Sequence, residues 1–390
     1  MTASLSQTKL LLQMLHRDPS PADSGRLARL SRDELADLVV AACNTRLSFQ
    51  YLQWLNAHPE CFARMPVSAM QELQKHVRRA FASNCAHQDH LRSLVDACAA
   101  EAIPIIAIKG LWLAEVAYRD IAARAPGDID VLVEAASMPR FTRLVKSLGF
   151  VVPDRVNDIR EIAPLSNEFP LMHRTNKAGF DVHWSLTRQV IEGDIDDAAI
   201  WRRAERWSMA GTTCASLCVE DHLLYVCFHI ANHHRFDFVG PRVLLDVATL
   251  IEQPPRPIDW DDVIARAHER GWARGARLVF ELVREHLGTQ PPREVIDALA
   301  PRQAQVLAGA TVHADAMVQG DATAPGLAQA QCDVLAADVR AAALDALLRP
   351  PPAGGSMSLW LVRLHGERSL RGRLQLLFDR LFPAREEIAR

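Results

Sequence analysis

The spacing of apolar residues predicts helices over the first part of the chain. Between residues 5 and 100, apolar positions recur at helical intervals, as at Leu35, Leu38 and Ala42. The preceding "SRDE" (31–34) has the form of a capping box, in which a serine oxygen and a glutamate carboxylate satisfy the first free amides. This stretch therefore predicts an N-terminal helical region.

The pattern then changes to short β-branched runs that alternate with helical ones. "IPIIAI" (103–108) and "IDVLVE" (129–134) predict buried strands, each followed by a helical pattern. The second of these helices ends at Gly149, and "FVVP" after it predicts a third strand. "LMHRT" and "GFDVHWSL" predict a hairpin that turns between residues 175 and 179. The alternation indicates a small α/β unit with a mixed sheet.

From Asp194 onward the spacing predicts helices again, most clearly in "VEDHLLYVCFHIANHH" and "PRVLLDVATLIE". The proline-rich "RPPPAGGS" (349–356) predicts a linker to a terminal amphipathic helix, whose arginines we interpret as a solvated face. These arginines are Arg363, Arg368, Arg371, Arg373 and Arg380. The predicted order is a helical region (1–100), an α/β core (101–190), a helical domain (191–348), and a linker with its terminal helix (349–390).

Composition narrows the class of protein. The 390 residues suffice for two or three domains, and 44 basic against 47 acidic residues argue against a general nucleic-acid or membrane-surface binder. The sequence has no apolar run long enough to span a membrane and no signal-peptide pattern, so a cytoplasmic location is expected. The eight cysteines form no C-x-x-C motif, which favours reduced, buried thiols.

Two aspartates at the start of the second predicted strand are the main chemical signal. Asp128 and Asp130 point to the same side because side chains alternate along a strand, and like charges so placed repel. A divalent cation such as Mg²⁺ removes that repulsion and gains hard oxygen ligands. Asp181, flanked by Phe180 and Val182, supplies a third carboxylate, as a two-metal phosphoryl-transfer site requires.

Basic residues near these aspartates indicate an anion site. Lys109 and Gly110 end one strand and open a helix, where a lysine charge and free amides suit a phosphate group. Arg124 lies shortly before Asp128 and is a candidate for nucleotide binding. It is also a candidate salt-bridge partner that would replace the metal and inactivate the site.

The run K-G, a helix, R-x-x-x-D-I-D-V-L-V and then F-D-V-H-W resembles the uncharacterised nucleotidyltransferase-like family of the DNA polymerase β nucleotidyltransferase superfamily, from about residue 35 to about residue 290. The resemblance implies an α+β fold: a polymerase-β-like core with a mixed sheet, flanked by N- and C-terminal helical regions. It implies that Asp128, Asp130 and Asp181 are catalytic and hold two Mg²⁺ or Mn²⁺ ions. Lys109 and Gly110 match the glycine motif, but Lys-Gly-Leu lacks the hydroxyl that the wider superfamily offers to the triphosphate.

Histidines form a second candidate group. His222, Val226, His229 and His233 follow one stripe of a predicted helix, and the last two histidines have metal-ligand spacing without an H-E-x-x-H glutamate. The resemblance matches Asp246 to the acidic residue of the following helix. These groups either contact substrate or form a hydrogen-bonded His–Asp network between helices. His183, two residues after Asp181, faces the same side as that aspartate.

These signals support three hypotheses of function. The leading one is a Mg²⁺-dependent nucleotidyltransferase that moves NMP from an NTP to a hydroxyl or phosphate of a small molecule, peptide or protein. The second is a non-catalytic nucleotide-binding or scaffold protein, in which Arg124 neutralises the aspartate pair. The third is a metal-dependent hydrolase that uses the histidine stripe.

Overall fold

The structure is a computed structural model that describes residues 5–125, 127–153, 167–175, 178–187, 197–234, 236, 239–300 and 339–348. The chain divides into two compact units, each assembled from non-contiguous segments. The first unit draws on Met1–Phe81, Val116–Ala125 and Cys218–Pro350. The second draws on Ala82–Glu115, Pro126–Leu217 and Pro351–Arg390. The four segments predicted from the sequence are each continuous in the chain, unlike these units, and their boundaries remain a prediction.

The N-terminal part of the first unit is helical, as predicted. Its elements are α1 (Leu5–Leu15), α2 (Pro21–Leu27), α3 (Arg32–Asn44), α4 (Ser48–Ala57), α5 (Pro59–Arg64) and the start of α6 (Val67–Ala100). The capping box is confirmed: Glu34 N–H donates to Ser31 Oγ (3.2 Å), and Ser31 N–H donates to the Glu34 carboxylate (2.8 Å). Apolar faces of these helices form one core, with Leu35, Leu55 and Cys61 fully buried.

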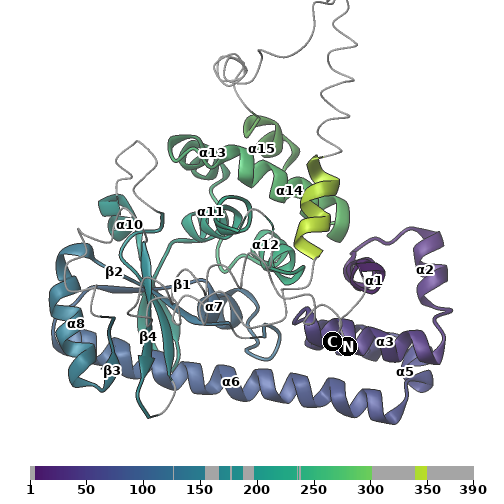
Figure 1. The fold of residues 1–390 in the computed structure, drawn as a ribbon. Coiled ribbons are helices and arrows are strands. Elements are labelled where there is room, and N and C mark those ends of the chain that lie inside the picture. The colour runs from purple at the N-terminus through teal and green to yellow at the C-terminus, as the bar shows by residue number, and fades with distance from the viewer. Residues whose placement is uncertain are drawn as a thin grey trace, which may run out of the picture. The chain divides into compact units, whose positions relative to one another are not determined.

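The C-terminal part of the first unit contains the other predicted helices. They are α11 (Val219–Phe228), the π-turn η4 (His229–His233), α12 (Arg242–Glu252), α13 (Trp260–Glu269), α14 (Ala273–Leu287), α15 (Arg293–Ala298) and a helix at 339–348. In Figure 1, α13, α14 and α15 gather beside α11 and α12. The Phe228 and Trp272 rings stack at 4.5 Å between α11 and the start of α14, which helps to join this bundle.

The second unit is built on a seven-stranded sheet of order β3-β4-β5-β2-β1-β7-β6. Figure 1 labels β1, β2, β3 and β4. The strands are β1 (Ile105–Ile108), β2 (Ile129–Val133), β3 (Phe150–Val151), β4 (Glu168–His173), β5 (Gly179–His183), β6 (Glu205–Met209) and β7 (Thr212–Ser216). The β2–β5 and β1–β7 pairs are parallel and the others antiparallel. The helical elements are α7 (Gly110–Trp112), η1 (Leu113–Ala117, which continues into the first unit), η2 (Ala135–Ser137), α8 (Met138–Ser147) and α10 (Asp197–Arg203). The α+β class with a mixed sheet is confirmed.

The prediction of helices from Asp194 onward is wrong for β6 and β7. These strands form a hairpin with Ala210 (φ 53°) and Gly211 (φ 71°) at its turn, as a two-residue turn between right-twisted strands requires. Glu115 holds the strained turn, because its carboxylate accepts the Ala210 N–H at 2.9 Å. The sequence signal was a small residue followed by glycine between two short runs, which the search for helical periodicity passed over.

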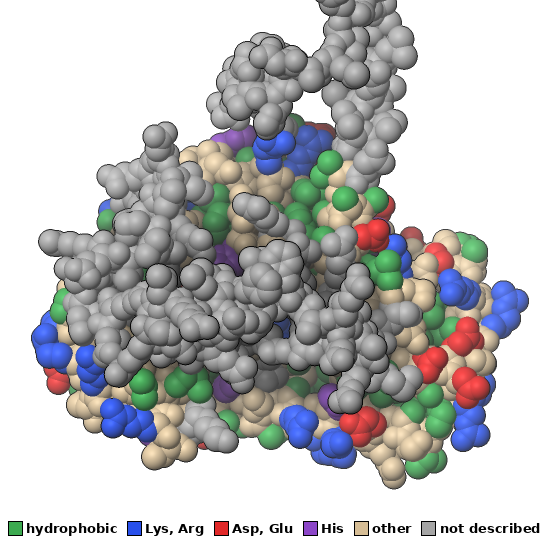
Figure 2. Space-filling model, in the orientation of Figure 1, with side chains coloured by type: hydrophobic (Ala, Val, Ile, Leu, Met, Phe, Trp, Pro, Cys, Tyr) green, Lys and Arg blue, Asp and Glu red, His purple; other side chains and the backbone are tan. Residues whose placement is uncertain are grey.

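Several other predictions concern the chain as a whole. Seven cysteines lie in the described residues and all are unpaired thiols, as expected. No helix in this part of the chain is both long and apolar enough to cross a membrane. On the face in Figure 2, basic and acidic side chains are interspersed over the described surface. The predicted terminal helix and its five arginines lie outside the described residues.

Candidate carboxylate site

The register of two parallel strands places Asp130 and Asp181 side by side. They are direct partners between β2 and β5, so both side chains leave the same face of the sheet, on strands about 4.8 Å apart. The next residues along the two strands, Val131 and Val182, point to the other face and are fully buried. Asp128 is exposed and directly precedes the first residue of β2. Apolar alternation along both strands therefore fixes where the carboxylates point.

Lys109 and Gly110 join this group from the end of β1. The Lys109 ammonium lies 3.1 Å from Asp130 Oδ1, because the antiparallel β1–β2 pairing sets Ile108, the residue before the lysine, opposite Asp130.

The backbone at Lys109 and Gly110 is tightly constrained. A Cβ on Gly110 would lie 3.0 Å from the carbonyl oxygen of Asp128, so only a hydrogen fits without a shift. Lys109 has φ 49° and ψ −121°, a backbone region normally occupied by glycine. A non-glycine residue there stores strain of about 1–3 kcal/mol, and such strain is concentrated at functional sites.

His183 and Glu168 extend the group on the other side of Asp130. His183 is 1% exposed, and its Nε2 lies 3.2 Å from Asp130 Oδ1. Its Nδ1 lies 3.0 Å from Glu168 Oε2, but the two atoms are not aligned for a hydrogen bond. Sequence reasoning missed Glu168 because it began this strand at Leu171, whereas β4 begins at Glu168. The apolar residues Phe169 and Leu171, spaced two apart as on one face of a strand, were the available signal.

The electrostatics of the group are unbalanced. Burial opposes ionisation of Asp130, but Lys109 and His183 outweigh it and hold its pKa at about 2. Burial raises the pKa of Asp181 well above its usual value, and the charges of Asp130, Asp128 and Glu168 raise it further. The carboxyl groups of Asp128, Asp130, Asp181 and Glu168 therefore outnumber the one lysine ammonium, that of Lys109.

The donor set fits a hard divalent cation, which prefers carboxylate oxygen and would relieve this excess. Asp128, Asp130 and Asp181 do not, however, form a set whose ligand atoms all lie within 4.8 Å; among the described residues, His229, His233 and His234 do. In two-ion sites the ligands are shared between ions about 3.5–4 Å apart, so they need not all converge on one point.

Arg124 and Asp246, also predicted as site residues, lie together in the first unit. Arg124 Nε and Nη2 donate to the two Asp246 oxygens at 2.9 and 3.0 Å, and Tyr118 Oη donates to Asp246 at 2.9 Å. Arg242 donates to the Ala125 carbonyl, and burial lowers its pKa to about 9, helped by the Arg124 charge. The cation paired with Asp130 is Lys109, whereas Arg124 is paired with Asp246.

The histidine stripe is only partly as predicted. His222 is fully buried in α11, whereas His229 and His233 lie in the π-turn η4, and His233 is exposed. His234, which sequence reasoning did not single out, joins them, because the π-turn changes which residues share a side.

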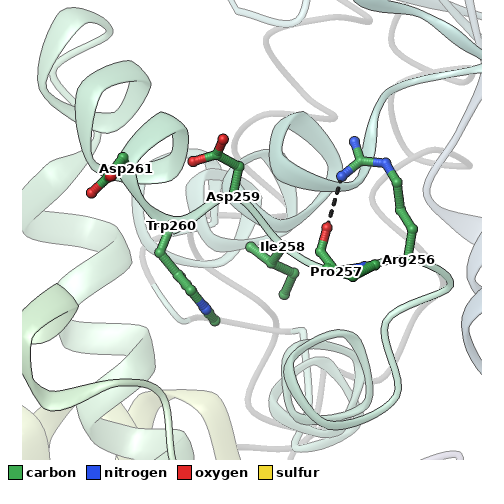
Figure 3. Close-up of a pocket in the computed structure, with 6 residues that line it drawn as sticks. All are labelled: Arg256, Pro257, Ile258, Asp259, Trp260 and Asp261. Atoms are coloured by element: carbon green, nitrogen blue, oxygen red, sulfur yellow. Dashed lines mark hydrogen bonds between the residues drawn. The ribbon is translucent and has the colours of Figure 1, made fainter.

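A surface hollow of about 560 Å³ lies elsewhere in the first unit, lined by residues 256–261 (Figure 3). Arg256 donates to the Pro257 carbonyl at 3.0 Å, and both of its terminal nitrogens donate to Glu220. Its charge is thus already paired, and the hollow contains none of the predicted site residues.

Comparison with known proteins identifies the family. No curated protein and no solved structure gives a significant match. The family described as "Uncharacterised nucleotidyltransferase" matches residues 33–288, which include every predicted site residue. The chain therefore belongs to this nucleotidyltransferase family.

Proposed function

We propose that the protein is a Mg²⁺-dependent nucleotidyltransferase that moves NMP from an NTP to a hydroxyl or phosphate of a small molecule, peptide or protein in the cytoplasm. The observation that carries the proposal is the register of Asp130 with Asp181, beside Lys109 and an excess of negative charge. Family membership supports nucleotidyl transfer in general.

Each residue of the site has a role in this proposal. Asp128, Asp130 and Asp181 would hold Mg²⁺, or Mn²⁺ in its place, which when bound neutralises the triphosphate and polarises the attacking hydroxyl. Lys109 and the amides after Gly110 would bind phosphate. His183 orients Asp130 through its 3.2 Å contact.

The scaffold hypothesis is the second candidate, and one observation favours it. Lys109 lies 3.1 Å from Asp130, as a cation would if it replaced a metal in a degenerate site. Asp181 supports the catalytic proposal over the scaffold hypothesis, because it places a second carboxyl group in register with Asp130, whereas Lys109 is paired with Asp130.

Thermal melts test the proposal before any acceptor is known. Mg²⁺ at about 100 times its Kd adds about 2.7 kcal/mol, so the wild-type melting temperature should rise by about 3 °C. Asp181→Asn should raise the melting temperature without Mg²⁺, because it removes a carboxyl group whose ionisation is opposed by burial and by the neighbouring acids, and should largely abolish the response to Mg²⁺.

Asp89→Asn is the matched control, since Asp89 is an exposed acid of the second unit that pairs with Arg92. It should keep the full response to Mg²⁺. A wild-type protein indifferent to Mg²⁺, with or without NTP, would remove the catalytic proposal. Labelled NTPs incubated with the protein and a cell extract would then identify the nucleotide and the acceptor.

A further inference from the structure

Three histidines of the first unit form a compact group of nitrogen donors, which we call the histidine cluster: His229, His233 and His234. Their ring centroids lie 5.1, 4.4 and 4.9 Å apart, and Nε2 of His229 lies 3.0 Å from Nε2 of His234. Each ring offers one nitrogen within 4.8 Å of the other two.

The backbone explains this convergence. The His234 N–H donates to the His229 carbonyl at 3.0 Å, which closes the five-residue step of a π-turn. In such a turn the residues four and five positions after the first flank it, whereas in an α-helix the residue five positions on would lie on another side. Single π-turns within helices are frequent at functional sites.

We propose that the histidine cluster binds a first-row transition-metal dication of the Zn²⁺, Co²⁺, Ni²⁺ or Cu²⁺ class. Imidazole suits these borderline ions, whereas Mg²⁺ prefers oxygen. Two nitrogens bound to one Zn²⁺ at about 2.1 Å lie at most about 4.2 Å apart, so small side-chain movements complete the site. Three protein ligands leave a position open, and the exposed His233 puts it within reach of solvent.

This site goes beyond the proposed function, because it lies in the first unit and has a different donor chemistry. The carboxylate site of the second unit offers oxygens, whereas all three donors here are imidazole nitrogens. The two sites can therefore be separated by the choice of metal.

The test uses the full chain with any affinity tag removed, in excess Mg²⁺ to saturate oxygen sites. Zn²⁺ binding is measured by calorimetry, and Co²⁺ binding by its visible absorption. His233→Ala, an exposed substitution with little risk to folding, should weaken Zn²⁺ binding at least about 10- to 100-fold, by analogy with the loss of supporting groups at metal sites. His234→Ala should do the same.

His268→Ala is the control, since His268 is an exposed histidine of the same unit that contacts the Ala298 carbonyl. The His268→Ala variant should bind Zn²⁺ as wild type does. The Co²⁺ complexes of both proteins should show the intense visible absorption bands of a low-coordinate site. Equal Zn²⁺ affinity in wild type, His233→Ala and His234→Ala would overturn the proposal, whatever the outcome of the Mg²⁺ melts.

Discussion

Asp246 in the first unit and Asp130 in the second are both shielded acids paired with a basic side chain. Asp246 is 1% exposed and accepts from the Arg124 fork and from the Tyr118 hydroxyl. One carboxylate therefore meets one guanidinium, with hydrogen bonds to both oxygens. This balance is what a buried ion pair needs in order to support the fold.

Asp130 has a different balance. Lys109 and His183 contact it, but Asp181 stands beside it in register, with Asp128 and Glu168 close enough to raise the Asp181 pKa. Ionising all of these carboxyl groups costs free energy in the protein alone, and a bound cation would lower that cost. The comparison teaches that charge balance, rather than burial, distinguishes the structural acid from the candidate ligand.

The largest expected effect is on the balanced pair. Asp246→Ala leaves the Arg124 guanidinium buried without its partner and should lower the free energy of unfolding by about 3–5 kcal/mol. Urea denaturation measures this change, and the Mg²⁺ response of the folded protein should persist. A loss below about 1 kcal/mol would mean that Asp246 is not the structural acid.

Asp130→Asn should mainly affect catalysis. Under the proposed function, loss of this candidate metal ligand should slow nucleotidyl transfer by on the order of 10²-fold, as the loss of other preorganised electrostatic groups does. The D-x-D pattern alone suggests that this change relieves repulsion, but the structure predicts destabilisation, because Lys109 and His183 lose their partner. Transfer assays and melts of the same variant separate these effects, and an unchanged rate would exclude Asp130 from the site.

The strain at Lys109 gives a smaller effect. Lys109→Gly and Lys109→Ala both remove the ion pair, but only glycine adopts φ 49° and ψ −121° readily. The glycine variant should therefore be more stable than the alanine variant by about 1–2 kcal/mol in urea denaturation. Equal stability would show that the backbone at this position is not strained.

Glu220 provides a second balanced acid, and its effect depends on pH. Burial opposes its ionisation, but hydrogen bonds from Arg256 and the Asp259 amide outweigh this and hold its pKa at about 2. Because the folded pKa is below the unfolded one, this stability is present above about pH 5 and is lost as pH falls toward 2. After allowance for solvent screening, Glu220→Gln should remove about 1 kcal/mol of this acid-dependent stability. Thermal melts of wild type and Glu220→Gln between about pH 6 and about pH 3 measure this contribution, and an equal pH dependence in the two proteins would contradict the prediction.

The sequence alone determined the helices, the first five strands and the faces of the key aspartates. Apolar periodicity decides which side of an element is buried, so Phe180 and Val182 on either side of Asp181 were enough to orient it. The start of α3 could also be predicted, because the capping box depends only on hydrogen bonds between residues three apart in the chain. The β6–β7 hairpin was missed because its two short strands carry weak periodicity.

Only the tertiary structure decided which charged groups meet. Strand pairing brings Asp130 into register with Asp181, and the fold pairs Arg124 with Asp246 rather than with the aspartates of β2. The π-turn adds His234 to the histidine cluster, although helical spacing alone points to His229 and His233. These outcomes depend on contacts between residues far apart in the chain or on a local change of helical pitch, and spacing along the sequence encodes neither.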